Sequence, residues 1–359
     1  MKCTKIICID KKPQEKKLFF GDYDRFTRID QITYPQIKKL YESSESNTWF
    51  MNEISYEKDI VGWKELPEVA QDMFKKNISY QTLMDSGVTS IFHEVAKVAS
   101  VSELQYLYNR IGIEENIHAL SYSNALDTVF GAQAEEILDE VYTDPFIKRR
   151  MESEVDGSEK FLNVVFRQGK TDDEAKMALL ELLGAVFALE GIKFPFSFFV
   201  TWTINKSYNN NIQGMARLLK LIAWDEMTVH TTTGSTVLGI LRKDESQGFT
   251  HLFDKFDDFM YDYIEKVSKA EMEWSDYLLQ NGNIPGYNKE IGEHFIKYWA
   301  DRRLKEIKLQ PIFNEKRSDI IDWYERYRNL NLTTTALQEA DATNYQKGKL
   351  QNDLDKFDV

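Results

Sequence analysis

The sequence predicts an all-α protein built of long helices, and three observations lead to this prediction. From about Glu68 onward, apolar residues recur with a period near 3.6 in almost every segment, as they do on one face of an α-helix. Runs of strictly alternating polar and apolar residues, which would indicate β-strands, are short and few. Several helical stretches exceed 25 residues and have no heptad seam, so we expect a bundle large enough to cover them on several sides.

The expected elements follow one another with few interruptions. Residues 1–17 are polar and carry no strong signal, residues 34–41 have helical spacing, and residues 59–67 have the composition of a helix start. Beyond them we expect helices at residues 66–86, 88–97, 102–130, 135–153, 158–168, 172–203, 209–242, 247–280, 287–304 and 314–328. The periodic pattern ends near Asn331, and no internal repeat of fixed period is visible.

The chain is expected to form one large domain with a C-terminal tail. Its 359 residues would allow two domains, but no linker rich in Pro, Gly or Ser and no shift in composition divides it. With 42% hydrophobic and 13% aromatic residues, the chain can bury a substantial core. We therefore expect a domain over residues 1–330 and a flexible tail over residues 331–359, where the polar pattern offers no face to bury.

Charge and cysteine content exclude some functions. The net charge of −13 argues against binding to nucleic acid or to an anionic membrane, because such contacts need clustered Lys and Arg. The two cysteines, Cys3 and Cys8, form neither a disulfide framework nor a zinc motif, which indicates a reducing, cytoplasmic location. The N-terminus carries no apolar run of signal-peptide length.

The most apolar segment, Met177–Trp202, is long enough to span a membrane but has the wrong composition. Glu181, Glu190 and Lys193 interrupt it, and charges in the middle of a bilayer are expensive. We therefore expect a helix buried inside the protein and no membrane contact.

A short motif in the middle of a long helical pattern points to a metal. Residues 115–122 read E-N-I-H-A-L-S-Y, so Glu115 and His118 lie three residues apart and Tyr122 lies four further on. At 3.6 residues per turn, all three project from one face. A carboxylate and an imidazole at this spacing can hold one metal ion, with a phenol beside it. Because E-x-x-H is short and common, this interpretation needs support from the rest of the chain.

That support comes from acidic residues on helix faces that are otherwise apolar: Asp85, Glu115, Glu190 and Glu226. Burying one unpaired carboxylate costs several kcal/mol, so four in one bundle imply cations that neutralise them. With His118 and His230, these carboxylates can hold two divalent ions, which is the arrangement of ferritin-like di-iron or di-manganese bundles. Oxygen and nitrogen ligands suit iron or manganese, and the lack of nearby thiolates argues against structural zinc.

One spacing departs from this arrangement. Three residues separate Glu226 from His230, where the E-x-x-H pattern has two. A spacing of four leaves both side chains on one face, about 40° apart rather than 60°. A π-bulge would absorb the extra residue.

With these positions in hand, the chain resembles the small, radical-generating subunit of class I ribonucleotide reductase. The resemblance extends from L-F-F-G at Leu18 to the C-terminus. It rests on Y-Q-T-L-M-D-S at Asp85, E-x-x-H-x-x-x-Y at Glu115, E-G-I-K-F at Glu190, I-A-W-D-E at Glu226, and Q-E-A-D-A-T-N-Y at residues 338–345. Trp224 stands where many relatives carry Arg.

The resemblance implies a role for each matching residue. Asp85, Glu115 and His118 would bind one ion, and Glu190, Glu226 and His230 the other. Tyr122 matches the tyrosine that the metal centre and dioxygen oxidise to a stable radical. Phe194, Phe198 and Ile222 match the apolar pocket that would shield that radical.

The resemblance also implies a route for the radical and a partner. Trp49 and Asp225, with His118, match the start of the path by which the radical leaves the site. In the tail, Glu339 and Tyr345 match residues that relay it across a subunit interface. The terminal D-L-D-K-F-D-V matches the peptide that docks on the large subunit, and Leu354 and Phe357 would be its apolar anchors.

The expected protein is therefore a homodimeric small subunit with two iron ions, or a dimanganese or mixed centre, activated by dioxygen. It would pass the radical to a separate large subunit that reduces ribonucleoside diphosphates to deoxyribonucleotides. Two alternatives stay open at this point. The same centre would oxidise an organic substrate in a ferritin-like oxygenase or oxidase, and a non-catalytic bundle would only bind metal.

Overall fold

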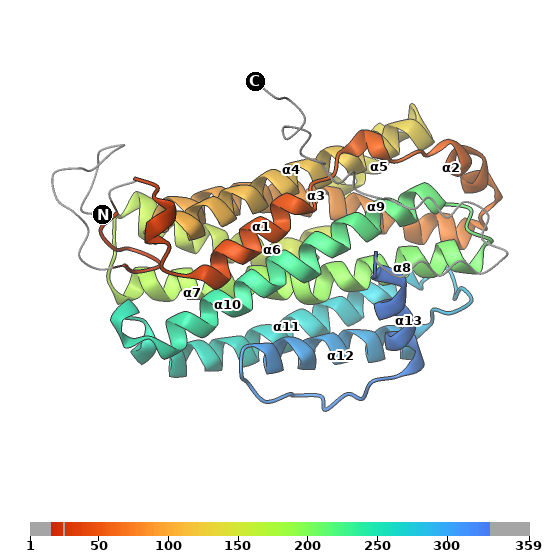
Figure 1. The fold of residues 1–359 in the computed structure, drawn as a ribbon. Coiled ribbons are helices and arrows are strands. Elements are labelled where there is room, and N and C mark those ends of the chain that lie inside the picture. Colours follow the sequence, from red (N-terminus) through yellow and green to blue (C-terminus); the bar gives the residue numbers. More distant parts are fainter. Residues whose placement is uncertain (1–15, 24–25, 331–359) are drawn as a thin grey trace, which may run out of the picture.

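Thirteen α-helices account for most of the residues that the computed structural model describes, which are 16–23 and 26–330 (Figure 1). They are α1 (Pro35–Ser46), α2 (Glu57–Gly62), α3 (Glu68–Val98), α4 (Ser102–Phe130), α5 (Gln133–Thr143), α6 (Pro145–Phe161), α7 (Asp173–Ala188), α8 (Phe194–Ser207), α9 (Gln213–Trp224), α10 (Thr231–Lys243), α11 (Phe253–Leu278), α12 (Lys289–Glu306) and α13 (Asp319–Arg328). Short 3₁₀ segments are Ile29–Gln31, Met51–Glu53, Trp63–Glu65, Glu245–Gln247 and Thr250–Leu252. The described residues contain no β-strand, only two isolated β-bridges, so the all-α prediction is confirmed.

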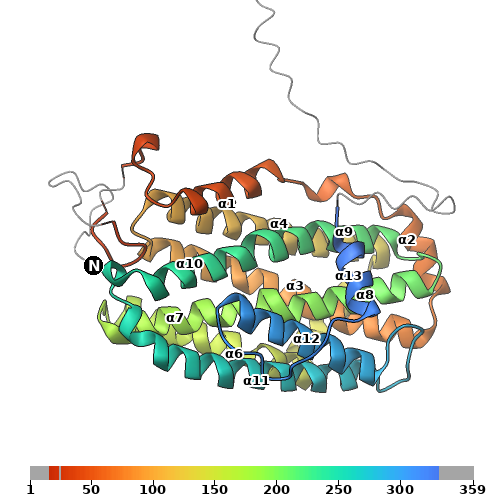
Figure 2. The same ribbon diagram turned by 60° about the horizontal axis from the view of Figure 1, so that its bottom comes forward.

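The long helices lie side by side and run roughly along one direction (Figures 1 and 2). The pair α3 and α4 packs along its length, and α7 contacts α6, α10 and α11. The short helix α13 crosses that common direction in both views. Buried apolar side chains from these helices form one continuous core, as expected for a single large bundle.

Three π-helical segments, in which the backbone makes wider turns, extend or interrupt these helices. The first, η4 (Leu162–Arg167), extends α6. The second, η5 (Leu189–Lys193), joins α7 to α8, and the third, η6 (Asp225–His230), joins α9 to α10. As a result, residues 173–207 and residues 213–243 each form one uninterrupted helical run through the core.

Several predicted helix boundaries are wrong. The expected break at residues 154–157 does not occur, since α6 and η4 are continuous from Pro145 to Arg167. The expected break near Gly87 does not occur, because α3 runs through it from Glu68 to Val98. A glycine inside a helix costs only about 1 kcal/mol, and the packing of α3 against α4 offsets that cost. The predicted helix at residues 135–153 is instead divided at Asp144. Pro145 occupies the first turn of α6, and the Asp144 side chain accepts hydrogen bonds from the N–H groups of Phe146 (2.7 Å) and Ile147 (3.2 Å).

The apolar segment Met177–Trp202 lies in the run formed by α7, η5 and α8, and most of its side chains are buried. Among the described residues, no helix is both long and apolar enough to cross a bilayer. Cys3, Cys8 and the predicted tail, with Glu339, Tyr345, Leu354 and Phe357, lie outside the described residues.

Candidate metal centre

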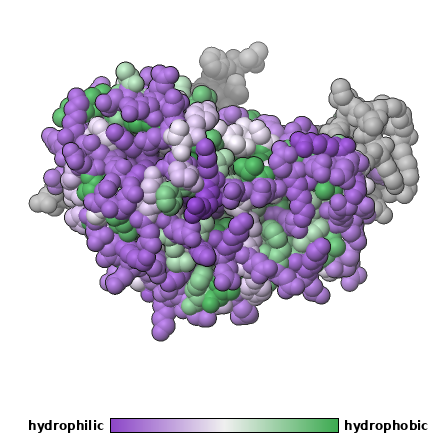
Figure 3. Space-filling model, turned by 180° about the vertical axis from the view of Figure 1, so that it is seen from behind, coloured by the Kyte–Doolittle hydropathy of each residue, from purple (hydrophilic) through white to green (hydrophobic). Residues whose placement is uncertain are grey.

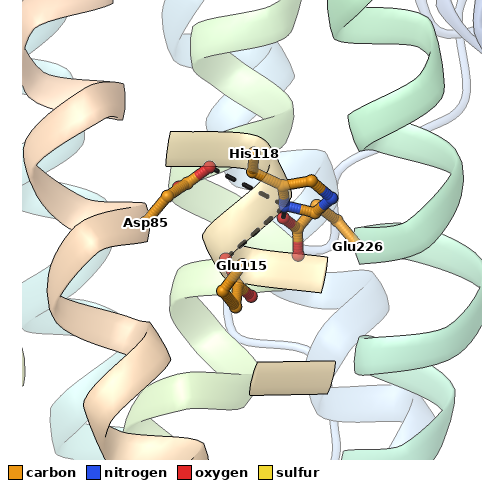
Figure 4. A group of neighbouring side chains, drawn as sticks. All are labelled: Asp85, Glu115, His118 and Glu226. Atoms are coloured by element: carbon orange, nitrogen blue, oxygen red, sulfur yellow. Dashed lines mark ion pairs between the residues drawn. The ribbon is translucent and has the colours of Figure 1, made fainter. Parts of the chain in front are cut away.

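The six predicted ligands come from four segments of the bundle. They are Asp85 on α3, Glu115 and His118 on α4, Glu190 on η5, and Glu226 and His230 on η6. Figure 4 shows four of these side chains pointing toward one another from three helices. Residues far apart in the sequence therefore meet at one place in the core.

Their ligand atoms form two groups, and within each group all atoms lie within 4.8 Å of one another in the part of the chain that the structure describes. The groups are Asp85, Glu115, His118 and Glu226, and Glu115, Glu190, Glu226 and His230. Glu115 and Glu226 belong to both groups. Where the resemblance assigned each of these two carboxylates to one ion, the geometry places each within reach of both.

The first group surrounds the imidazole of His118. Its Nδ1 atom lies 3.1 Å from Glu226 Oε1, 3.5 Å from Glu115 Oε2 and 3.8 Å from Asp85 Oδ2. These distances bring carboxylates from three helices to one nitrogen.

The second group surrounds His230 in the same way. Its Nδ1 atom lies 2.7 Å from Glu226 Oε2, 3.2 Å from Glu115 Oε1 and 3.9 Å from Glu190 Oε2. The rings of His118 and His230 lie 6.0 Å apart between centroids, at an interplanar angle of 28°. Each imidazole therefore turns Nδ1 toward the shared carboxylates.

The donor set fits a pair of metal ions. All six side chains are at most 4% exposed. Within the described part of the chain, no hydrogen bond reaches either oxygen of the four carboxylates or Nδ1 of the two imidazoles. Buried polar atoms without partners are rare unless something else binds them. The negative charge of four carboxylates balances the positive charge of two divalent cations. Oxygen and imidazole donors suit iron or manganese.

The protonation equilibria reflect this crowding of charge. Burial raises the pKa of Asp85 and of Glu190 well above the usual range, and the charges of Glu115 and Glu226 add to the rise. Burial alone would lower the pKa of both imidazoles, but the facing carboxylates outweigh it and raise both values. The cluster by itself therefore retains protons, which metal binding must displace.

The outer nitrogen of His118 contacts two further predicted residues. Its Nε2 atom lies 3.2 Å from Asp225 Oδ2, which also accepts a hydrogen bond of 2.8 Å from the Trp49 indole N–H. The Trp49 ring stacks on His118 at 5.8 Å between centroids and 12° between planes. Sequence reasoning placed these three residues together, and the geometry joins them in one chain of contacts.

The corresponding partner of His230 was not predicted. Its Nε2 atom lies 3.1 Å from Glu114 Oε2, and Glu114 is only 3% exposed. The available signal was the doubled acid E-E at residues 114–115, but consecutive helix residues project about 100° apart. If Glu115 faces the core, Glu114 is expected to face solvent. The sequence does not reveal that His230 lies beside it.

Tyr122 is fully buried, and its hydroxyl has no hydrogen-bond partner among the described residues. Burial raises the pKa of this phenol well above its usual value, and the charge of Asp85 is the next largest cause. Three side chains predicted to shield it are also fully buried: Phe194, Phe198 and Ile222. The phenol therefore stays protonated in a dry site beside the carboxylate cluster.

The π-helix η5 that carries Glu190 is held by buried ion pairs. The Lys193 carbonyl accepts a hydrogen bond of 3.1 Å from Arg150 of α6, and Arg150 binds both oxygens of Glu271 of α11 at 2.6 Å. In return, the Lys193 ammonium donates to the Arg150 carbonyl at 2.6 Å and to Glu154 at 2.8 Å. A widened turn leaves backbone groups to satisfy, and these contacts satisfy one of them.

A glycine allows a neighbouring helix to approach the same turn. A Cβ atom at Gly191 would lie 2.3 Å from Cδ of Arg303, a buried residue of α12. Only glycine fits this contact without movement of the arginine. Close packing against Arg303 therefore requires a glycine at position 191, next to Glu190.

The π-helix η6 absorbs the extra residue between Glu226 and His230, as the π-bulge hypothesis predicted. The Thr231 hydroxyl donates a hydrogen bond of 2.7 Å to the Glu226 carbonyl, which stabilises the wide turn. Both side chains consequently reach the shared cluster despite the unusual spacing.

We expect Arg150→Met to lower the free energy of unfolding by about 3–5 kcal/mol, because it leaves the buried carboxylate of Glu271 without its partner. Chemical denaturation measures this change. The control is Arg167→Met in an exposed ion pair with Glu159, where the loss should stay below about 1 kcal/mol. Equal losses in the two variants would contradict this role for the buried pair.

A narrow cavity reaches the second ligand group between α3, α4, α7 and α10. Its lining is mostly apolar and includes Tyr108 and Thr233, with Glu190 and His230 at the cluster. It offers about 20 Å³ to the centre of a water-sized molecule. That is room for one or two such molecules, whereas sites for organic ligands usually exceed about 300 Å³.

The helical bundle and its buried ligand groups define a class of protein, the ferritin-like bundles with a site for a dinuclear metal centre. The sequence profile described as "Ribonucleotide reductase, small chain" matches residues 27–319. This chain belongs to that family, and the resemblance inferred from the sequence is confirmed.

Individual relatives agree with this assignment. The chain is 25% identical to the ribonucleoside-diphosphate reductase subunit beta of Treponema pallidum, over 94% of this chain and 93% of that protein. It is 26% identical to the ribonucleoside-diphosphate reductase 1 subunit beta of Salmonella typhimurium, over 96% and 95%. The ribonucleotide reductase R2 subunit from Clostridium botulinum has the same fold, with a TM-score of 0.79, 24% identity, and coverage of 90% of this chain and 98% of that one.

Proposed function

We propose that this protein generates and stores a tyrosyl radical at Tyr122 for a class I ribonucleotide reductase. The observation that carries the proposal is a fully buried phenol one turn after His118 on α4, without a hydrogen-bond partner among the described residues. The charges of the two ligand groups, which share Glu115 and Glu226, help to raise its pKa. Asp85, Glu115, His118, Glu190, Glu226 and His230 would hold two iron ions, or a dimanganese or mixed centre. The bound ions would supply the reaction with dioxygen that oxidises the tyrosine.

The surroundings of Tyr122 suit a long-lived radical. The phenol must lose a proton together with its electron, because a buried cation without a partner would be costly. Burial, and after it the charges of neighbouring carboxylates with Asp85 first among them, raise the pKa of this phenol, so it keeps its proton until it is oxidised. The buried side chains of Phe194, Phe198 and Ile222 keep water and reductants away.

The exit route begins at His118. Contacts of 3.2 Å from its Nε2 to Asp225, and of 2.8 Å from Asp225 to Trp49, link the cluster to a buried tryptophan. Indole is an oxidisable group, and the carboxylate of Asp225 can accept its proton. We propose that Glu339 and Tyr345, which lie outside the described residues, continue the route to the large subunit.

The cavity argues against the oxygenase alternative. An enzyme that oxidises an organic substrate needs room for it beside the metals, and the space at Glu190 and His230 accommodates only one or two water-sized molecules. A non-catalytic bundle would need the ligands but not the contacts between His118, Asp225 and Trp49. Both alternatives are therefore less well supported than radical generation.

We propose that the protein forms a homodimer through the outer face of α4. Tyr106, Ile113 and Leu120 lie seven residues apart along α4 and are 40%, 47% and 60% exposed. Seven residues are two helical turns, so these side chains form one apolar line. Figure 3 shows one face of the molecule, which is mainly hydrophilic with separate apolar patches. Such an exposed apolar line suits contact with a second copy.

We propose that the terminal peptide docks on the large subunit, which reduces ribonucleoside diphosphates. Removal of residues 339–359 should abolish reductase activity with the large subunit but leave metal content and the radical signal unchanged. Phe357→Ala should weaken subunit binding by at least about tenfold, because burying an aromatic side chain contributes about 1.5–3 kcal/mol. Lys356→Ala, in the same peptide, should change it little. Full activity of the truncated chain would exclude the relay and docking roles.

The test of the proposed function is the electron paramagnetic resonance spectrum of the metal-free protein after ferrous iron and air are added. A tyrosyl doublet, together with ribonucleotide reduction when a large subunit is present, would support the proposal. Oxidised iron without a radical and without reduction would contradict it and favour a storage bundle. The cytoplasmic location inferred from the cysteine content remains part of the same proposal.

A further inference from the structure

The carboxylate of Glu114 is buried in the core but does not belong to either ligand group. It precedes the ligand Glu115 on α4 and turns toward η6, where its Oε2 atom lies 3.1 Å from His230 Nε2. An ionised carboxylate only accepts hydrogen bonds, so Nε2 is the donor. The lone pair of a neutral imidazole then lies on Nδ1, the atom that faces Glu226 and Glu115.

A second set of contacts holds Glu114 itself in place. Its Oε1 atom accepts a hydrogen bond of 2.5 Å from the Ser44 hydroxyl of α1 and lies 3.4 Å from Nη2 of Arg110. Arg110 in turn donates to Ser44 Oγ at 2.9 Å and to Thr48 Oγ1 at 2.8 Å. The carboxylate is therefore fixed from both α1 and α4 before it contacts the imidazole.

The two outer carboxylates are related in a reciprocal way. Asp225 precedes the ligand Glu226 on η6 and contacts His118 of α4, whereas Glu114 precedes the ligand Glu115 on α4 and contacts His230 of η6. Each helix thus supplies the acid that orients the imidazole of the other. The two acidic pairs, E-E and D-E, are the sequence pattern of this exchange.

We propose that Glu114 is a positioning residue for His230, equivalent to Asp225 for His118. It selects the nitrogen that faces the metal and fixes the orientation of an imidazole carried on a widened turn. Without a hydrogen bond to its ring, the His230 imidazole could rotate about its side-chain torsions. The hydrogen bond to the Glu114 carboxylate removes that freedom. This inference rests on the proposed dinuclear centre.

The experiment is titration of the metal-free protein with Mn(II), in which free ion is followed by its electron paramagnetic resonance signal. Wild type should bind two ions per chain. Glu114→Gln should weaken one binding step by about 10- to 100-fold and leave the other unchanged, because substitution of such outer partners typically has effects of that size. Anomalous diffraction from Mn(II)-loaded crystals should show the lost occupancy at the site beside His230.

Glu103→Gln is the matched control. Glu103 is also a buried acid of α4, and its Oε1 atom accepts hydrogen bonds from the N–H groups of Thr33 and Tyr34, which glutamine retains. This variant should bind two ions with the affinities of wild type. A purely structural role for Glu114 predicts instead that both steps weaken together in Glu114→Gln, with lower thermal stability.

The outcomes separate the inference from its premise. If wild type binds two ions and Glu114→Gln also does so with unchanged affinities, the positioning role is wrong while the centre stands. Parallel loss of both steps, or loss at the site beside His118, would overturn the inference as well. If wild type itself binds no ions, the proposed function fails, and the inference falls with it.

Discussion

Tyr122→Phe is expected to bind two metal ions as wild type does and to give no tyrosyl radical. The substitution removes only the hydroxyl, which makes no hydrogen bond among the described residues, so the packing of this fully buried ring should persist. Phenylalanine is far harder to oxidise than a phenol. Reductase activity with the large subunit should therefore fall to the background rate.

The electron paramagnetic resonance spectrum after addition of ferrous iron and air measures the effect, with metal analysis beside it. Tyr108→Phe is the matched control, since Tyr108 is also a buried phenol of α4 without a hydrogen-bond partner in the described structure. The control should keep the signal. A signal that persists in Tyr122→Phe but disappears in Tyr108→Phe would place the radical at Tyr108.

The second large effect is expected at the carboxylates that the two groups share. Glu226→Gln should reduce the metal content from two ions per chain to none, because Glu226 belongs to both groups. Glu190→Gln should reduce it to one, because Glu190 belongs to the second group alone. An amide keeps the size of the side chain but removes the charge that holds a cation.

Metal analysis after removal of loosely bound ions measures this difference. Thermal unfolding gives a second measure, since a ligand at a thousand times its dissociation constant stabilises the folded state by about 4 kcal/mol. That stabilisation should vanish in Glu226→Gln and persist in part in Glu190→Gln. Equal metal content in the two variants would show that Glu226 does not serve both ligand groups.

The sequence was sufficient for the features that depend on hydrophobic pattern. Asp85, Glu190 and Glu226 stood out because each acid interrupts an apolar helix face, and burial of charge without neutralisation is too costly to be accidental. The helix at residues 102–130 was predicted with the bounds of α4 for the same reason, since its apolar period is uninterrupted. The period of the apolar residues indicates which face of each helix is buried, and the candidate ligands lie on that face.

Features that depend on tertiary contacts were not predictable in this way. Helix α3 passes Gly87 because α4 packs along it, and no local signal reports that packing. The break at Asp144 was missed although the Asp-Pro pair is a local signal, because the apolar period continues across it. Glu114 escaped detection because its burial depends on an imidazole more than 100 residues away.

The two halves of the candidate centre stand on different kinds of backbone. Asp85, Glu115 and His118 project from regular α-helix, whereas Glu190, Glu226 and His230 project from the widened turns of η5 and η6. A widened turn is rare, is frequently found at functional sites, and leaves backbone groups that other contacts must satisfy. We therefore expect a change of charge in the centre to displace Glu190, Glu226 and His230 more than Asp85, Glu115 and His118.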